Sequence, residues 1–104
     1  AYDLRPMALA IRQVEAEGRP VANIGAYHAQ YQFLGRLKTS LAELSGADVM
    51  SWLASHPQGY AVIYLKDGSK LNGVAARYQQ SYRDGTVALV DSTTAANLLA
   101  AGVQ

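Results

Sequence analysis

Residues 60–65, Tyr-Ala-Val-Ile-Tyr-Leu, form an almost uninterrupted apolar run and decide the fold class. A run of this length and composition is typical of a strand that is covered on both faces of a sheet. Pro57 and Gly59 precede the run, and Asp67-Gly68 follow it as a turn. The stretch therefore predicts a central, buried strand with defined ends.

A helix is expected just before this strand. Ser45-Gly-Ala-Asp48 fits a capping box, in which the serine accepts from an unpaired backbone N–H and the aspartate reaches back. Val49, Trp52 and Leu53 follow at helical spacing and predict a buried stripe. His56 ends the helix, where it is expected to interact with the helix dipole or the last carbonyl groups.

A hairpin is expected after the strand. Asp84-Gly85 separates two strand-like runs, and such a dipeptide suits a turn whose central residues need positive φ. Residues 74–83 also show helical spacing, but the turn favours strands near 76–83 and 86–91. The end of the chain, residues 93–101, predicts a short helix that stops at Gly102.

The beginning of the chain predicts a helix followed by a strand. Asp3 is the expected N-cap, Pro6 suits the first turn, and Gly18 suits the end. Residues 20–24 then read as a short buried strand. The helix is expected to bury one apolar stripe, made of Leu4, Met7, Ala8, Ile11 and Val14.

These elements predict one α/β domain over residues 1–104, with α+β as the alternative class. The expected architecture is a small mixed sheet of three to five strands, with helices packed against it and a hairpin near the C-terminus. The chain carries nine basic and eight acidic residues, for a net charge of +1. No run of like charges occurs, so the charge pattern excludes an electrostatic footprint for nucleic acid.

The composition points away from several kinds of chemistry. The absence of cysteine excludes disulfides and thiol-based sites. Only two histidines occur, His28 and His56, without metal-ligand spacing, so neither a metal site nor a cofactor is expected. The carboxylates fall at caps, turns and solvated faces, and no pair suggests acid–base catalysis. No apolar run approaches the roughly 18–20 residues that span a bilayer.

The densest group of candidate contact residues follows the first strand, between Gly25 and Leu37. Ligands of open α/β sheets bind beyond the carboxyl ends of strands, and this segment starts at such an end. Tyr27, His28, Gln30 and Tyr31 could hydrogen-bond or stack on a sugar or another polar ligand. The structural alternative is that the segment only covers the edge of the sheet and binds no ligand.

A second candidate group lies on the predicted hairpin. Arg77, Tyr78, Tyr82 and Arg83 combine aromatic rings with guanidinium groups, which bind phosphate oxygens well. Such a pattern also suits the solvent face of a strand, where arginine stems cover tyrosine rings.

Six segments together resemble the soluble C-terminal domain of bacterial membrane glycosyltransferases of the aminoarabinose-transferase and protein-mannosyltransferase-like class. The resemblance covers essentially the whole chain. The segments are Asp3-Leu-Arg-Pro6, Gly18-Arg-Pro-Val21, Tyr27-His-Ala-Gln30, Phe33-Leu-Gly-Arg36, Trp52-Leu-Ala-Ser-His-Pro57 and Tyr82-Arg-Asp-Gly85.

The resemblance implies a non-catalytic domain at the periplasmic face of the inner membrane. Members of the family move a sugar from a polyprenyl-phosphate donor, and their catalytic acid lies in a separate membrane-spanning domain. The implied partners are that transmembrane domain of the same protein and a lipid-linked sugar or acceptor. The start at Ala1-Tyr2-Asp3 suggests a piece of such a longer protein.

Two other classes of function stay open. One is a stand-alone module that binds a sugar or sugar phosphate, or another protein. The other is a small hydrolase, which would need His28 or His56 as its base.

Overall fold

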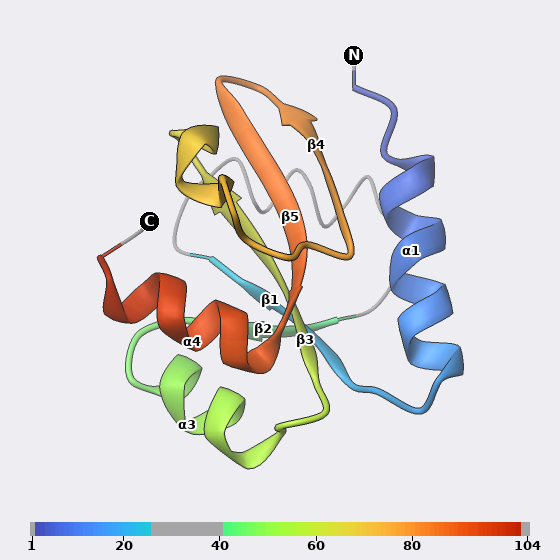
Figure 1. The fold of residues 1–104 in the computed structure, drawn as a ribbon. Coiled ribbons are helices and arrows are strands. Elements are labelled where there is room, and N and C mark those ends of the chain that lie inside the picture. Colours follow the sequence, from blue (N-terminus) through green and yellow to red (C-terminus); the bar gives the residue numbers. More distant parts are fainter. Residues whose placement is uncertain (1, 26–40, 103–104) are drawn as a thin grey trace.

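A computed structural model describes residues 2–25 and 41–102 of the chain. Its centre is a five-stranded mixed sheet with the strand order β2-β1-β3-β5-β4 (Figure 1). β1 is parallel to β2 and β3, whereas β5 is antiparallel to β3 and β4. The strands are β1 (Val21–Ile24), β2 (Ala42–Leu44), β3 (Tyr60–Leu65), β4 (Tyr78–Tyr82) and β5 (Gly85–Asp91).

Helices cover both faces of this sheet (Figure 1), and its mixture of parallel and antiparallel strands makes the fold α+β. In the described ranges α1 (Arg5–Ala16) packs on one face. α3 (Asp48–Ser55) and α4 (Ser92–Ala100) pack on the other. A short 3₁₀ turn, η1 (Gly68–Leu71), follows β3. The expected small mixed sheet with packed helices and a C-terminal hairpin is confirmed.

The central position of β3 follows from its sequence. Val62 and Tyr64 pack into the core beneath α1, while Ala61, Ile63 and Leu65 pack beneath α3 and α4. All five side chains are at most 3% exposed. Because successive side chains of a strand point to opposite faces, only a continuous apolar run can fill two cores at once.

Two predicted N-caps are wrong. α1 has Leu4 as its N-cap, one residue after Asp3, although the Asp3 carboxylate still accepts the backbone N–H of Arg5 at 3.0 Å. The capping box at Ser45 does not form, because α3 begins only at Asp48 with Ala47 as its N-cap. Gly46 takes a left-handed conformation with φ of 60°, so the chain turns before the helix starts.

The hairpin turn lies one residue earlier than predicted. Tyr82 pairs with Gly85, so the two central turn residues are Arg83 and Asp84. Arg83 has a φ of 55°, the only positive φ of a non-glycine residue in ranges 2–25 and 41–102. Gly85 serves a different need: a Cβ atom there would lie 2.4 Å from the carbonyl oxygen of Leu65.

The end of α3 matches its prediction in part. His56 is the C-cap, and its Nδ1–H donates to the carbonyl oxygen of Trp52 at 2.8 Å, as expected for a histidine at a helix end. Its ring stacks on Trp52 with centroids 4.2 Å apart. Trp52 packs against the core from one side only and stays half-buried.

Candidate functional site

The first candidate site is the edge of the sheet where the parallel strands end. β1 lies between β2 and β3 and is parallel to both, so the carboxyl ends of three strands meet at this edge. Ligands of open α/β sheets bind beyond the carboxyl ends of strands. Gly25 stands at this point, where its N–H donates to the carbonyl oxygen of Leu44 at 3.2 Å. We call this region, where β1 and β3 end, the carboxyl edge.

The aromatic segment predicted from the sequence starts at the carboxyl edge. Tyr27, His28, Gln30 and Tyr31 themselves lie outside the described residues. The structure describes only Gly25, the residue at which this segment starts.

A tyrosine–carboxylate pair also lies at the carboxyl edge. The hydroxyl group of Tyr64, near the end of β3, donates to the carboxylate of Asp84 in the hairpin turn. Burial of Tyr64, which is 3% exposed, together with this hydrogen bond raises the pKa of its hydroxyl to about 12. The same bond holds the pKa of the Asp84 carboxyl below its usual value. At neutral pH the pair is therefore a fixed donor and a fixed anion.

Arg83 reaches the carboxyl edge through the hairpin. Leu65 pairs with Thr86, which puts the turn next to the end of β3. The Arg83 carbonyl oxygen accepts the hydroxyl group of Tyr2 at 2.8 Å. Its guanidinium carbon lies 5.9 Å from the centre of the Tyr82 ring, within cation–π range. Arg83 is exposed.

Arg77 lies at the opposite end of the sheet and serves a structural contact. Its guanidinium makes a two-pronged ion pair with Glu17 at the end of α1, with one contact at 3.1 Å. This ion pair lowers the pKa of the Glu17 carboxyl. The Tyr60 ring lies between Arg77 and Arg19, at 5.7 and 5.8 Å from their guanidinium carbons. At this end of the sheet the structural alternative therefore holds: the arginines cover a tyrosine ring and do not form a phosphate site.

The second predicted group therefore does not form one site. Six steps along β4 and its turn separate Arg77 from Arg83, which corresponds to about 20 Å. Tyr82 is 1% exposed and belongs to the core beneath α1, so its ring is not available to a ligand or partner. Tyr78 is half-buried, and its hydroxyl group donates to Gln80 at 3.2 Å. Only Arg83 stays a contact candidate at the carboxyl edge.

Asn23 is a buried polar residue that no sequence motif marks. Its side chain is fully buried in β1, two positions before Gly25, and neither amide atom has a hydrogen-bond partner among the described residues. Its neighbours in register are Glu43 on β2 and Val62 on β3. The sequence feature that could have indicated it is a single polar residue inside an otherwise apolar strand.

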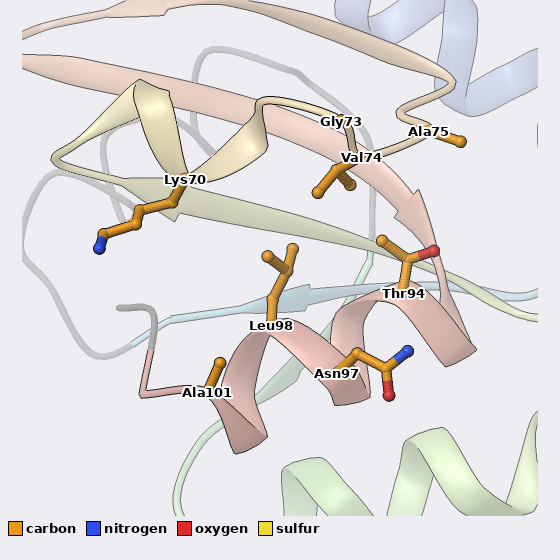
Figure 2. A pocket seen from close by; sticks show the side chains of 8 residues that line it. All are labelled: Lys70, Gly73, Val74, Ala75, Thr94, Asn97, Leu98 and Ala101. Atoms are coloured by element: carbon orange, nitrogen blue, oxygen red, sulfur yellow. The ribbon is translucent and has the colours of Figure 1, made fainter.

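The second candidate site is a cavity of about 370 Å³ on the face of the sheet that carries α4. Figure 2 shows it between the chain that follows η1 and the side of α4 that carries Leu98. Val74 and Leu98 point toward one another across it, and the Lys70 side chain extends from η1 at one end. The lining residues are Lys70, Gly73, Val74, Ala75, Thr94, Asn97, Leu98 and Ala101. No motif joins these segments, so the sequence carried no signal for this cavity.

The described part of the chain shows no group of three His, Asp or Glu side chains that could hold a metal ion. No helix within those residues is long and apolar enough to cross a membrane.

Comparisons with protein-family models, curated proteins and solved structures find no significant match. The function of this chain is therefore inferred from its own residues and geometry.

Proposed function

We propose that this chain is a non-catalytic domain of a bacterial membrane glycosyltransferase that uses a polyprenyl-phosphate sugar donor. It would sit at the periplasmic face of the inner membrane, pack on the membrane-spanning catalytic domain and shape the access of the acceptor. The sequence resemblance in six segments supports this proposal.

The position of Gly25 carries the proposal furthest. Tyr27-His-Ala-Gln30, the segment with the most hydrogen-bonding side chains, continues from the carboxyl edge, where open sheets bind their ligands. Arg83, from another segment of the resemblance, lies at the same edge. Contact with a neighbouring domain or with substrate is thus assigned to this edge, and Arg77 at the far end is not part of it.

The first test reads the coding sequence upstream of Ala1. The proposal expects a series of apolar spans of about 20 residues each, because the catalytic domain must cross the membrane. Absence of such spans would refute it. Localised amide shifts at Ile24 and Gly25 on adding sugar phosphates to a chain without such spans would instead identify a stand-alone ligand-binding module.

The second test changes the segment inside the full-length enzyme. Gln30→Ala and His28→Ala are expected to raise the acceptor KM about fivefold, the effect of losing one hydrogen bond of roughly 1 kcal/mol, with a small change in kcat. Gln79→Ala is the matched control, because Gln79 is an exposed glutamine on β4, away from the carboxyl edge. Equal kinetics of the Gln30→Ala, His28→Ala and control enzymes would contradict the assignment of this edge.

A further inference from the structure

The cavity above α4 has the size and the variety of side chains of a small-molecule site. Its volume of about 370 Å³ falls within the range of roughly 300–1,000 Å³ in which small ligands bind. Three segments far apart in sequence build it: η1, the chain at 73–75 that leads to β4, and the helix α4. The cavity is on the opposite face of the sheet from α1, and its Lys70 end follows the end of β3.

The charge in this cavity has one sign. Lys70 is the sole charged residue that lines it, and no carboxylate lies within 4.0 Å of the Lys70 ammonium among residues 2–25 and 41–102. The nearby carboxylate of Asp67 accepts the backbone N–H and the hydroxyl group of Ser69, at 3.0 and 2.6 Å. These hydrogen bonds, and to a smaller extent the charge of Lys70, lower the pKa of the Asp67 carboxyl, but no ion pair joins Asp67 and Lys70 in the described residues. The Lys70 ammonium is therefore available to a further anionic group, for which lysine acts as a point charge.

Apart from Lys70, the cavity has an apolar middle and a threonine at the end opposite the lysine. Leu98 is 7% exposed and Val74 is half-buried, and their facing side chains make an apolar floor (Figure 2). Thr94 stands at the far end from Lys70, where the Asp91 carboxylate accepts its backbone N–H at 2.8 Å and so fixes its position. Its hydroxyl group makes no hydrogen bond within the described part of the chain and can serve a ligand.

We propose that this cavity binds a small amphipathic anion, with a phosphate or carboxylate head on Lys70 and a compact apolar body over Val74 and Leu98. The inference is independent of the proposed function, since none of the residues that line the cavity carries that proposal.

The test is a titration of the 104-residue chain followed by amide NMR shifts, with phenyl phosphate as the probe. Shifts are expected at Val74, Thr94 and Leu98, with weaker binding as salt rises. Phenyl glucoside, which keeps the ring but has no charge, and inorganic phosphate, which has no apolar body, are each expected to bind at least tenfold more weakly. Vesicles that contain phosphatidylglycerol distinguish a lipid headgroup from a soluble ester as the source of the anion.

Lys70→Gln is expected to weaken phenyl phosphate binding about tenfold and leave phenyl glucoside unchanged, because it removes a charged hydrogen bond only. Lys66→Gln is the matched control, since Lys66 is an exposed lysine that does not line the cavity. Ala101→Phe, which fills the cavity from the end of α4, is expected to abolish binding.

Two results would overturn the inference. One is the absence of localised shifts with millimolar phenyl phosphate. The other is a Lys70→Gln chain that binds the probe unchanged but melts at a lower temperature, which would show that Lys70 only balances the carbonyl groups at the end of η1.

Discussion

Tyr64 combines a buried ring with a hydroxyl group that is fixed on a carboxylate. Its pKa rises from 10.0 to about 12 on folding, so the unfolded chain releases this proton first as the pH increases. We expect the stabilising effect to be complete below pH 10 and to be lost between pH 10 and about 12, by about 1–3 kcal/mol in the free energy of unfolding.

Urea unfolding of the wild-type chain and of Tyr64→Phe across this pH range measures the effect. Tyr64→Phe should lower the free energy of unfolding at pH 7 by about 1.5–3 kcal/mol, the usual contribution of a hydrogen bond to a charged group. It should also show a shallower loss of stability above pH 10. A Tyr64→Phe chain with the same pH profile as the wild type would contradict the pairing with Asp84.

At Asn23 we expect a substitution to stabilise the chain, in contrast to Tyr64→Phe. The Asn23 amide has no partner within residues 2–25 and 41–102, and a buried amide without partners costs roughly 1–3 kcal/mol. Leucine has a similar branched shape without polar atoms. Asn23→Leu is therefore expected to raise the free energy of unfolding by about 1 kcal/mol or more, measured by urea unfolding. Asn23→Asp, which places a charge at the same site, should be strongly destabilising. A loss of stability in Asn23→Leu would indicate that the amide is needed in the folded chain.

Single-residue roles were the least predictable from sequence. Arg77 and Arg83 looked equivalent beside their tyrosines, yet one pairs with Glu17, 60 positions earlier in the chain, and the other lies at the hairpin turn. Tyr82 looked accessible but is buried, because the face of β4 that carries it lies under α1. Such roles depend on which elements pack together, and local sequence does not contain that information.

Secondary-structure elements allow a prediction about close contacts in the hairpin. A Cβ atom at Gly85 would lie 2.4 Å from the backbone carbonyl oxygen of Leu65 and 2.7 Å from the Tyr64 hydroxyl oxygen, so β5 would have to shift. We expect Gly85→Ala to lower the free energy of unfolding by about 2–3 kcal/mol, as other overpacked positions do, measured by thermal or urea unfolding.

Gly68→Ala is the matched control for this contact. Its Cβ atom would meet the Thr86 Oγ1 atom at 2.7 Å, but that is a side chain, which can rotate away. It should therefore cost less than Gly85→Ala. Equal losses in both variants would show that backbone contact with β3 is not what requires glycine at position 85.

Elements as a whole were well predicted, and their exact ends were not. The apolar run of β3 and the turn residues before β5 gave the central strand and the hairpin correctly. The predicted position of the hairpin turn was wrong by one residue, because Asp84-Gly85 matches a common turn pattern. Glycine at position 85 is instead required by the close contact with the Leu65 backbone. Caps shifted for a similar reason, since Gly46 turns the chain before α3 can begin.

The whole molecule is joined through β3, which pairs with a parallel strand on one side and an antiparallel strand on the other. β3 and β5 share six residue pairs, and their central residues are fully buried, whereas β2 pairs along one edge only and is largely exposed. We expect amide hydrogen exchange to be slowest in β3 and β5 and at least a hundredfold faster in β2, measured by NMR. Equal protection of β2 and β3 would contradict this order of local stability.

The hydrogen bond from Tyr2 to the Arg83 carbonyl oxygen also determines where a linker, tag or surface can be attached to the chain. It fixes the entry of the polypeptide beside the hairpin turn, at the carboxyl edge. A linker, affinity tag or sensor surface joined ahead of Tyr2 would therefore crowd this edge. One joined after α4 would crowd the cavity instead, because Ala101 lines it. Immobilised binding experiments on the two candidate sites thus need opposite ends of the chain as the point of attachment.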